Sequence, residues 1–358
     1  MTVAGVDLGG SKIAGVLLDE SGTVRGELWQ EHRIQGPDQA VELIGEVVGE
    51  LMAREPAAAR VAGEPAAGRV ARGQAAPGNA AAGSRRDLRS VGLAVAGWLS
   101  RDRQDVRSAV NLGITATPLA RLVQARLNCP VIVENDGNAA AYAEFTRGAG
   151  QQARVLMLIT LGTGVGGGIV SSGTLVQGSH GLAGELGHIP VERSGPGCIC
   201  GGRGCLELYA SGAAVTAQAR MRAGQPEGAA LLALAAGQPG QITSRQVVQA
   251  ARGGDACAAG ILATAGRAIG QAVAQVMPVV DPDLVVLTGS LATSAGDLIL
   301  VPARQELARQ HALRTVLDPV PIMLSQTGPG AAALGAAELA RRHPAARALA
   351  LARPQLPR

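Results

Sequence analysis

The sequence predicts an α/β fold built from two halves of similar topology. The chain has 358 residues, a length that suits two domains of ordinary size or one large α/β unit. Apolar runs typical of strands alternate with segments in which apolar residues recur at helical spacing. The pattern that opens the chain, a strand, a glycine-rich turn and a second strand, returns from Arg154 onward.

The N-terminal half opens with three predicted strands, VAGVDL, IAGVLLD and TVRGELW, and the turn GGSK joins the first two. Apolar residues between Pro37 and Glu55 then recur at the spacing of an amphipathic helix that the proline opens. A strand at 90–97, a helix at about 118–128, a strand at 130–135 and a helix from near Asp136 follow.

The second half repeats this order, because VLMLITL leads into the turn GTGVGG and Gly162 corresponds to Gly9. Residues 213–277 are mostly helical, and the strand LVVLTGS at 284–290 precedes a helical end. We expect an N-terminal α/β domain over 1–135 and a C-terminal α/β domain over 136–327. We expect the helical segment 328–358 to pack back on the N-terminal domain.

Residues 56–88 have a different composition from the rest of the chain. EPAAARVAG is nearly repeated as EPAAGRVARG, and the segment lacks large apolar residues, which predicts a mobile insertion. Its arginines could instead form an RNA-binding or partner-binding arm. The absence of interleaved aromatic residues argues against that alternative.

Composition indicates a globular protein of the cytoplasm. Hydrophobic residues make up 47% of the chain and aromatic residues only 1%, so Ala, Val, Leu and Ile must form the core. A net charge of +4 permits anionic ligands such as nucleotides without demanding nucleic acid. We see no secretion signal and no apolar stretch long enough to cross a membrane, and five cysteines suit a reducing compartment.

The pattern H-x9-C-x-C-x4-C is formed by His188, Cys198, Cys200 and Cys205. Three thiolates and an imidazole fill a tetrahedral Zn²⁺ site and leave no position for a catalytic water. A buried thiol cluster or a disulfide is the alternative, but two cysteines one residue apart bridge poorly. The pattern therefore favours structural zinc, and the ion could hold Glu185, His188 and Glu207 toward a ligand. Surface exposure explains the two glutamates equally well.

Two glycine-rich turns could bind phosphate groups, because glycine exposes backbone N–H groups. Asp7, Gly9, Gly10, Ser11 and Lys12 belong to the first, and Gly162, Thr163, Gly164, Val165, Gly166 and Gly167 to the second. Asp7 could hold a magnesium-bound water. Either turn alone is a common tight turn, but a repeated pair could grip one polyphosphate from both sides.

Candidate binding residues also lie at the ends of two other apolar strands. Asn135 offers a donor and an acceptor for sugar hydroxyls, and Asp136 can accept a hydroxyl proton during attack on phosphorus. The alternative is that Asp136 caps a helix starting at Gly137. Gly289 lies in the small-residue turn that ends the strand at 284–290, and it could leave flat space for an adenine.

Together these motifs resemble the ROK family of bacterial ATP-dependent sugar kinases, above all glucokinases, and sugar-responsive repressors. The most specific motifs are GELGH (184–188) and CICGGRGCLELYASG (198–212), followed by ENDGNAAA (134–141) and DLGGSK (7–12). The resemblance covers nearly the whole chain apart from 56–88. It implies the actin-like, ribonuclease-H-like fold of two α/β domains around a central cleft.

The resemblance also implies roles for individual residues. Asp136 would be the base that takes the proton from the sugar 6-hydroxyl. The residues expected to bind the other hydroxyls are Gly97, Asn111, Asn135, Glu185, His188 and Glu207. Residues 7–12 and 162–168 would cradle ATP phosphates with Mg²⁺, and Gly289 would border the adenosine. A homodimer or homotetramer is the family expectation.

Several activities fit this resemblance. Phosphorylation of glucose at its 6-hydroxyl is the main expectation, and N-acetylglucosamine, N-acetylmannosamine and fructose are alternative substrates. Relatives of the glucokinase type usually carry a tryptophan shortly after the asparagine, whereas this chain reads VNLGIT around Asn111. A sugar-sensing repressor is less favoured, because the first phosphate turn begins at Asp7 and leaves no room for a preceding DNA-binding segment.

Overall fold

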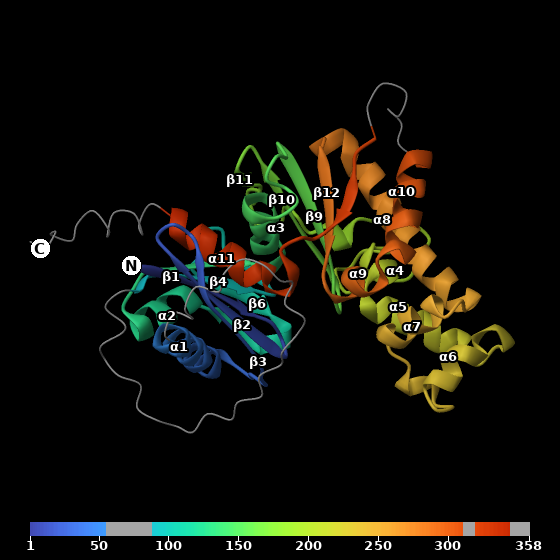
Figure 1. The fold of residues 1–358 in the computed structure, drawn as a ribbon, viewed down its shortest axis with the longest axis horizontal. Helices are drawn as coiled ribbons and strands as arrows, with labels where there is room; N and C mark the ends of the chain where they lie inside the picture. The colour runs from blue at the N-terminus through green and yellow to red at the C-terminus, as the bar shows by residue number, and fades with distance from the viewer. Residues whose placement is uncertain (55–87, 311–318, 344–358) are drawn as a thin grey trace, which may run out of the picture. The chain divides into compact units, whose positions relative to one another are not determined.

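The computed structural model of the chain describes residues 1–54, 88–310 and 319–343. The predicted insertion at 56–88 lies outside these ranges, except for Leu88, with which a strand begins. The described chain folds as two compact units (Figure 1). Unit 1 holds the described residues of 1–135 and 336–343, and unit 2 those of 136–335, so the return to unit 1 occurs at Ala336.

Unit 1 is built on a five-stranded sheet in the order β3-β2-β1-β4-β8. The strands are β1 (Thr2–Leu8), β2 (Lys12–Asp19), β3 (Val24–Glu31), β4 (Leu88–Val95) and β8 (Val131–Asn135). β1, β4 and β8 are parallel, whereas β2 pairs antiparallel with β1 and β3. The residues that follow β1, β4 and β8 therefore lie along one edge of this sheet, the edge where α/β proteins place ligands.

Helices cover both faces of this sheet (Figure 1). α1 (Pro37–Ala53) packs at Gly15, where an added Cβ would lie 2.7 Å from Val47. α11 (Ala331–Arg342) packs at Gly92, where an added Cβ would lie 1.9 Å from the backbone oxygen of Ala336. These two glycines pair with adjacent residues of β1, so they point to opposite faces. α2 (Leu119–Leu127) lies beside α1 and completes an aliphatic core.

We expect Gly92→Ala to destabilise unit 1 by about 1–3 kcal/mol, because the new methyl group overlaps the backbone of α11. Gly49→Ala is the matched control. Gly49 lies inside α1 with no atom within 4 Å of an added Cβ, so this change should stabilise the helix by roughly 0.5–1 kcal/mol. Urea unfolding of both variants checks the prediction, and equal midpoints would contradict the close contact of α11 with β4.

A small three-stranded sheet follows β4 in unit 1, in the order β5-β6-β7. Its strands are β5 (Trp98–Leu99), β6 (Val106–Ala109) and β7 (Ile114–Thr117). The sequence does not predict it, because its strands have only two to four residues, too few to show an alternating pattern. This sheet matters for the site because Gly97 precedes β5 and Asn111 lies in the turn between β6 and β7.

Unit 2 contains a second five-stranded sheet, in the order β11-β10-β9-β12-β13. Its strands are β9 (Val155–Leu161), β10 (Val165–Ser171), β11 (Thr174–Leu175), β12 (Leu284–Thr288) and β13 (Ile322–Leu324). β9 and β10 form an antiparallel hairpin, and β12 pairs parallel with β9. Each sheet therefore contains a hairpin, β1–β2 or β9–β10, whose first strand has a parallel neighbour on its other side. This shared arrangement corresponds to the repeat in the sequence.

The helices of unit 2 lie on both faces of its sheet (Figure 1). They are α3 (Asp136–Arg147), α4 (Glu207–Ala210), α5 (Gly212–Arg222), α6 (Ala229–Leu234), α7 (Ser244–Arg252), α8 (Ala256–Val280), α9 (Ser290–Ala295) and α10 (Asp297–Gln310). α3 packs on the face that includes Gly168, where an added Cβ would lie 2.8 Å from Ala141. Met157 and Ile159 face the other way, into a core shared with α5, α7 and α8.

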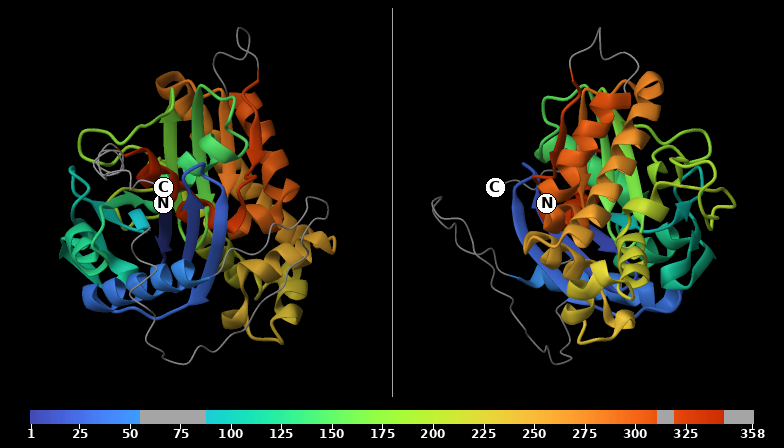
Figure 2. Two further views of the ribbon diagram at one scale, coloured as in Figure 1. Left: turned by 60° about the vertical axis from the view of Figure 1, so that its left-hand side comes forward. Right: turned by 90° about the vertical axis from the view of Figure 1, so that its right-hand side faces the viewer.

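α8 corrects one expectation from the sequence. By length and composition it is apolar enough to cross a membrane, although no stretch of the sequence was expected to qualify. Its buried residues belong to the core of unit 2, and it lies alongside α10 in both views (Figures 1 and 2). An added Cβ at Gly266 would lie 2.4 Å from the backbone oxygen of Ile299, so the two helices touch directly. Burial inside unit 2 explains the apolar sequence of α8.

Candidate functional site

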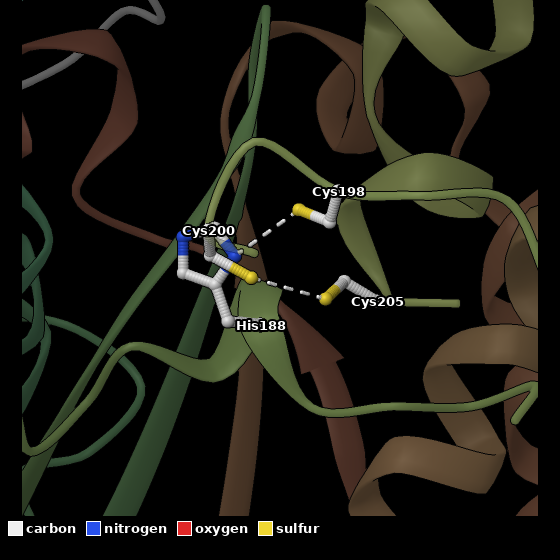
Figure 3. Close-up of side chains that lie close together, drawn as sticks. All are labelled: His188, Cys198, Cys200 and Cys205. Atoms are coloured by element: carbon white, nitrogen blue, oxygen red, sulfur yellow. Dashed lines mark hydrogen bonds between the residues drawn. The ribbon is translucent and has the colours of Figure 1, made fainter. Parts of the chain in front are cut away.

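The structure brings His188, Cys198, Cys200 and Cys205 together in unit 2 (Figure 3). Their candidate ligand atoms all lie within 4.8 Å of one another. His188 Nδ1 is 3.7 Å from Cys198 Sγ, and Cys200 Sγ is 3.6 Å from Cys205 Sγ. A tetrahedral zinc ion with metal–sulfur bonds of about 2.3 Å separates its sulfur ligands by about 3.8 Å. The four side chains therefore fit a structural zinc ion. We call them the Cys/His cluster.

Backbone pairing on both sides of the cluster explains how distant residues meet. Pro190 and Cys205 form an antiparallel bridge, and Leu206 N–H donates to Ile189 O at 2.8 Å. This pairing places Cys205 next to the short 3-10 helix Leu186–His188 that carries His188. The tight turn between Cys198 and Cys205 closes on itself, because Cys198 N–H donates to Gly202 O at 2.8 Å.

Two cysteines of the cluster have pKa values shifted in opposite directions. Burial raises the pKa of the Cys205 thiol to about 12, whereas a hydrogen bond from Gly202 N–H lowers the pKa of Cys200. Cys205 alone would therefore keep its proton at neutral pH. A bound Zn²⁺ would stabilise the thiolate and release that proton.

The tip of the β1–β2 hairpin (Gly9–Ser11, the first tip) presents open donors. Gly9 N–H donates to Lys12 O at 3.0 Å, which closes the turn. The N–H groups of Gly10 and Ser11 have no hydrogen-bond partner among the residues that the structure describes. Two adjacent open N–H groups suit a phosphate oxygen. Asp7 lies in β1 just before the tip, and the Lys12 ammonium lies 5.2 Å from the centre of the Trp29 ring.

The other sequence-predicted residues of unit 1 lie at the same edge of the sheet as the first tip. Asn135 Nδ2 donates to Gly97 O at 3.3 Å, which joins the ends of β8 and β4. An added Cβ at Gly10 would lie 2.8 Å from Asn111 Cβ, so Asn111 touches the first tip. Gly97, Asn111, Asn135 and the first tip therefore form one group within unit 1.

Glu134 supports the end of β8 beside this group through a hydrogen bond and an ion pair. Its carboxylate accepts the N–H of Asn135 at 2.9 Å and pairs with Arg103 at 3.0 Å. Glu134 is only 3% exposed, so this ion pair is desolvated and fixes the end of β8.

The tip of the β9–β10 hairpin (Gly162–Gly164, the second tip) repeats the arrangement of the first. Gly162 N–H donates to Gly164 O at 3.0 Å, and the N–H groups of Thr163 and Gly164 have no partner within the described part of the chain. Gly289 closes the end of β9, because an added Cβ there would lie 2.5 Å from Leu161 O.

Three predicted nucleotide-binding residues beyond the second tip lie in β10. Gly166 N–H donates to Thr160 Oγ1 at 3.0 Å, and Val165 N–H donates to Glu207 Oε2 at 2.9 Å. The backbone donors of Val165 and Gly166 are thus already used within unit 2. Gly167 lies under the start of α3, where an added Cβ at Gly137 would come within 2.4 Å of Gly167 O.

Asp136, Glu185 and His188 gather around β10. The sequence offered Asp136 as a cap before a helix starting at Gly137. In the structure α3 begins one residue earlier, so Asp136 is its first residue. Its helix contacts β10 just beyond the second tip. The turn that carries Glu185 and His188 packs on the first residue of β10, since an added Cβ at Gly187 would lie 2.1 Å from Val165 O. His188 Nε2 lies 4.0 Å from Glu185 Oε2, while His188 Nδ1 faces the Cys/His cluster.

A cavity of about 670 Å³ opens beside the second tip. Besides Gly162 and Thr163, its lining includes Thr216 and Arg220 of α5, Ser244 of α7 and Ser290 of α9. Arg220 donates to Ile242 O at 3.0 Å, which fixes its guanidinium in the wall. Sequence reasoning missed these four residues, because they come from three separate helices. The only local signal is Ser211-Gly212, which resembles a helix start and does cap α5.

Comparison with known proteins gives consistent results. The sequence model of the ROK family matches residues 79–343. A glucokinase from Streptomyces coelicolor is 35% identical over 339 residues, which cover 94% of this chain and 96% of that relative. An N-acetylmannosamine kinase from Yersinia pestis is 33% identical over 223 residues, 62% of this chain and 71% of that relative. The crystal structure of a ROK family glucokinase from Streptomyces griseus with glucose and AMPPNP is 32% identical, with a TM-score of 0.77, and the match covers 96% of this chain and 100% of that one.

Proposed function

The chain belongs to the ROK family, and on that premise we propose that it transfers the γ-phosphoryl group of ATP to the 6-hydroxyl of glucose. The α/β, actin-like fold expected from the sequence is confirmed by the two mixed sheets and by the likeness to the Streptomyces griseus glucokinase. The observation that carries the proposal is the 35% identity to a glucokinase over nearly the whole length of both chains.

In the proposed reaction, Asp136 takes the proton from the attacking hydroxyl. A carboxylate suits this role because the sugar hydroxyl is a poor nucleophile until its proton is accepted. The hydroxyls of the hexose are assigned to Gly97, Asn111, Asn135, Glu185, His188 and Glu207. Their side chains, Gly97 apart, offer oxygen or nitrogen atoms for the donor and acceptor pattern of a sugar ring.

The phosphates of ATP are assigned to the two hairpin tips. Each tip carries a pair of open N–H groups, Gly10 with Ser11 and Thr163 with Gly164, among the residues that the structure describes. Asp7 and Lys12 would act with them, Asp7 through Mg²⁺. The cavity beside the second tip offers about 670 Å³, and Gly289 lies at the end of the neighbouring strand β12, so we assign the adenosine there.

The Cys/His cluster is assigned a structural Zn²⁺ ion. When bound, the ion would offset most of the negative charge of the three thiolates and hold the chain around them. Its role is to hold the turn with Glu185 and His188, and α4 with Glu207, in the orientation that binds the hexose. We further propose that the protein is a homodimer or a homotetramer, and sedimentation of the purified protein would test this oligomeric state. We also propose that it is cytoplasmic and has no nucleic-acid or membrane partner.

A coupled ADP-release assay over a panel of hexoses tests the proposed function. The purified protein with ATP and Mg²⁺ should show its highest kcat/KM with glucose. Mannose, fructose, N-acetylglucosamine and N-acetylmannosamine complete the panel. A preference for N-acetylmannosamine would support the second candidate, which the 33% identity to an N-acetylmannosamine kinase motivates. Sugar binding by calorimetry without any ADP release would contradict a kinase and favour a sugar-sensing regulator.

A further inference from the structure

The segment that follows the Cys/His cluster makes two hydrogen bonds to the second tip and a third to Val165, the residue after the tip. Glu207 Oε2 accepts the N–H of Val165 at 2.9 Å. Five residues further on, Gly212 N–H donates to Gly162 O at 2.8 Å, and Ala213 N–H donates to Thr163 O at 3.3 Å. Residues 207–213 therefore hold two of the three backbone oxygens of the tip, those of Gly162 and Thr163, and the amide that follows the tip.

These bonds set the direction of the open donors. In a planar trans peptide, the C=O of one residue and the N–H of the next point in opposite directions. Because the oxygens of Gly162 and Thr163 point at the start of α5, the N–H groups of Thr163 and Gly164 point away from it. The hydrogen bonds from Gly212 and Ala213 thus orient the two donors that we assign to phosphate. The bond to Glu207 fixes the next peptide, between Gly164 and Val165.

The Cys/His cluster fixes the same segment from its other end. Cys205 lies two residues before Glu207, and Leu206 between them is fully buried and bonded to Ile189 O. The turn that carries His188 contacts Val165 O through Gly187, so Val165 is held on both its N–H and its C=O sides. A change at the cluster therefore has two routes to the residue that follows the second tip, one through α4 and one through the turn that carries His188.

We propose that Glu207 is a positioning residue for the nucleotide-binding tip, and that it couples this tip to the Cys/His cluster. The inference rests on the proposed function in assigning phosphate to the second tip. It adds to the sugar-binding role of Glu207 a second role toward the other substrate. A residue with both roles links hexose and nucleotide affinity, because each ligand then biases the same carboxylate.

Two effects of Glu207 on an anionic nucleotide oppose each other. Its negative charge repels phosphate, whereas its bond to Val165 orders the donors that bind phosphate. Glu207→Gln removes the charge and keeps an acceptor oxygen for Val165 N–H. Glu207→Ala removes both, so comparing the two neutral variants isolates the hydrogen bond.

The experiment measures the Kd of Mg–ADP by calorimetry without any sugar, on the full chain. We expect Glu207→Ala to bind about three- to tenfold more weakly than Glu207→Gln, the range of one hydrogen bond. Glu227→Ala and Glu227→Gln form the matched control pair, since Glu227 is an exposed carboxylate of the same unit and belongs to no assigned site. That pair should bind Mg–ADP equally.

Hydrogen exchange of the peptides that cover 160–166 gives a readout independent of activity and nucleotide. The amide of Val165 should exchange faster in Glu207→Ala than in Glu207→Gln. Removal of the metal by a chelator should speed exchange at the second tip in the wild type, and by less in Glu207→Ala. Equal exchange in the two variants, or a chelator effect confined to 198–205, would overturn the inference. Absence of Mg–ADP binding in the wild type would instead reject the proposed function, and the exchange data alone would then decide the positioning role.

Discussion

Asp136→Asn is expected to lower kcat by about 10²- to 10⁴-fold, with little change in hexose affinity or in the folded structure. The amide has the size and shape of the carboxylate but cannot accept the hydroxyl proton. Steady-state kinetics with glucose and ATP measure kcat, and calorimetry measures glucose binding. Because Asp136 is the first residue of α3, loss of its negative charge also costs roughly 0.3–1 kcal/mol of stability through the helix dipole.

Asp297→Asn is the matched control for that structural effect. Asp297 is the first residue of α10, in the same unit, and belongs to no predicted site. It should cost a similar small amount of stability and leave kcat unchanged. If Asp136→Asn kept more than about a tenth of the wild-type kcat, Asp136 would not be the catalytic base.

Loss of the metal from the Cys/His cluster is the second large expected effect. Cys205→Ser, or a chelator, should weaken glucose binding by at least about 100-fold, since the hydrogen bonds from Glu185, His188 and Glu207 depend on the chain that the metal fixes. Metal analysis of the purified wild type should give one zinc per chain, and calorimetry gives the glucose Kd. The variant should also unfold at a lower temperature, because metal binding contributes directly to folding.

Cys129→Ser controls for the general cost of replacing a buried thiol. Cys129 lies in unit 1, whereas the Cys/His cluster lies in unit 2, and it is not one of the four grouped side chains. Burial raises the pKa of its thiol to about 11. This variant should keep its zinc and its glucose affinity. Unchanged glucose affinity in zinc-free protein would contradict the assigned role of the ion.

Much of the fold follows from local sequence. The strands of both hairpins and the helix from Pro37 have strong apolar patterns, and the structure places them within a few residues of the prediction. β5, β6 and β7 were missed because strands of two to four residues carry no readable period. The helical character of 213–277 is predicted, but the length of the apolar run in α8 is not, because glycines interrupt it in the sequence. Two of them, Gly266 and Gly270, are contact points with α10.

The candidate site was predictable where its chemistry is local. The spacing of the cysteines and the glycine-rich turns identify the cluster and both tips directly. The bond from Glu207 to Val165 was not predictable, because nothing near residue 207 indicates which hairpin it meets. The same holds for Arg220 and Ser244, which line a cavity only after α5 and α7 have packed.

The contact of α11 with β4 has a consequence for the order in which the protein forms during synthesis. Unit 2 is one uninterrupted stretch of chain, whereas unit 1 is complete only when Ala336 and the residues after it have joined it. One face of the N-terminal sheet, around Gly92, therefore stays uncovered while the ribosome makes all of unit 2. The part of the chain that is translated first is the last to finish folding, so a nascent chain halted before α11 should expose apolar surface that chaperones recognise.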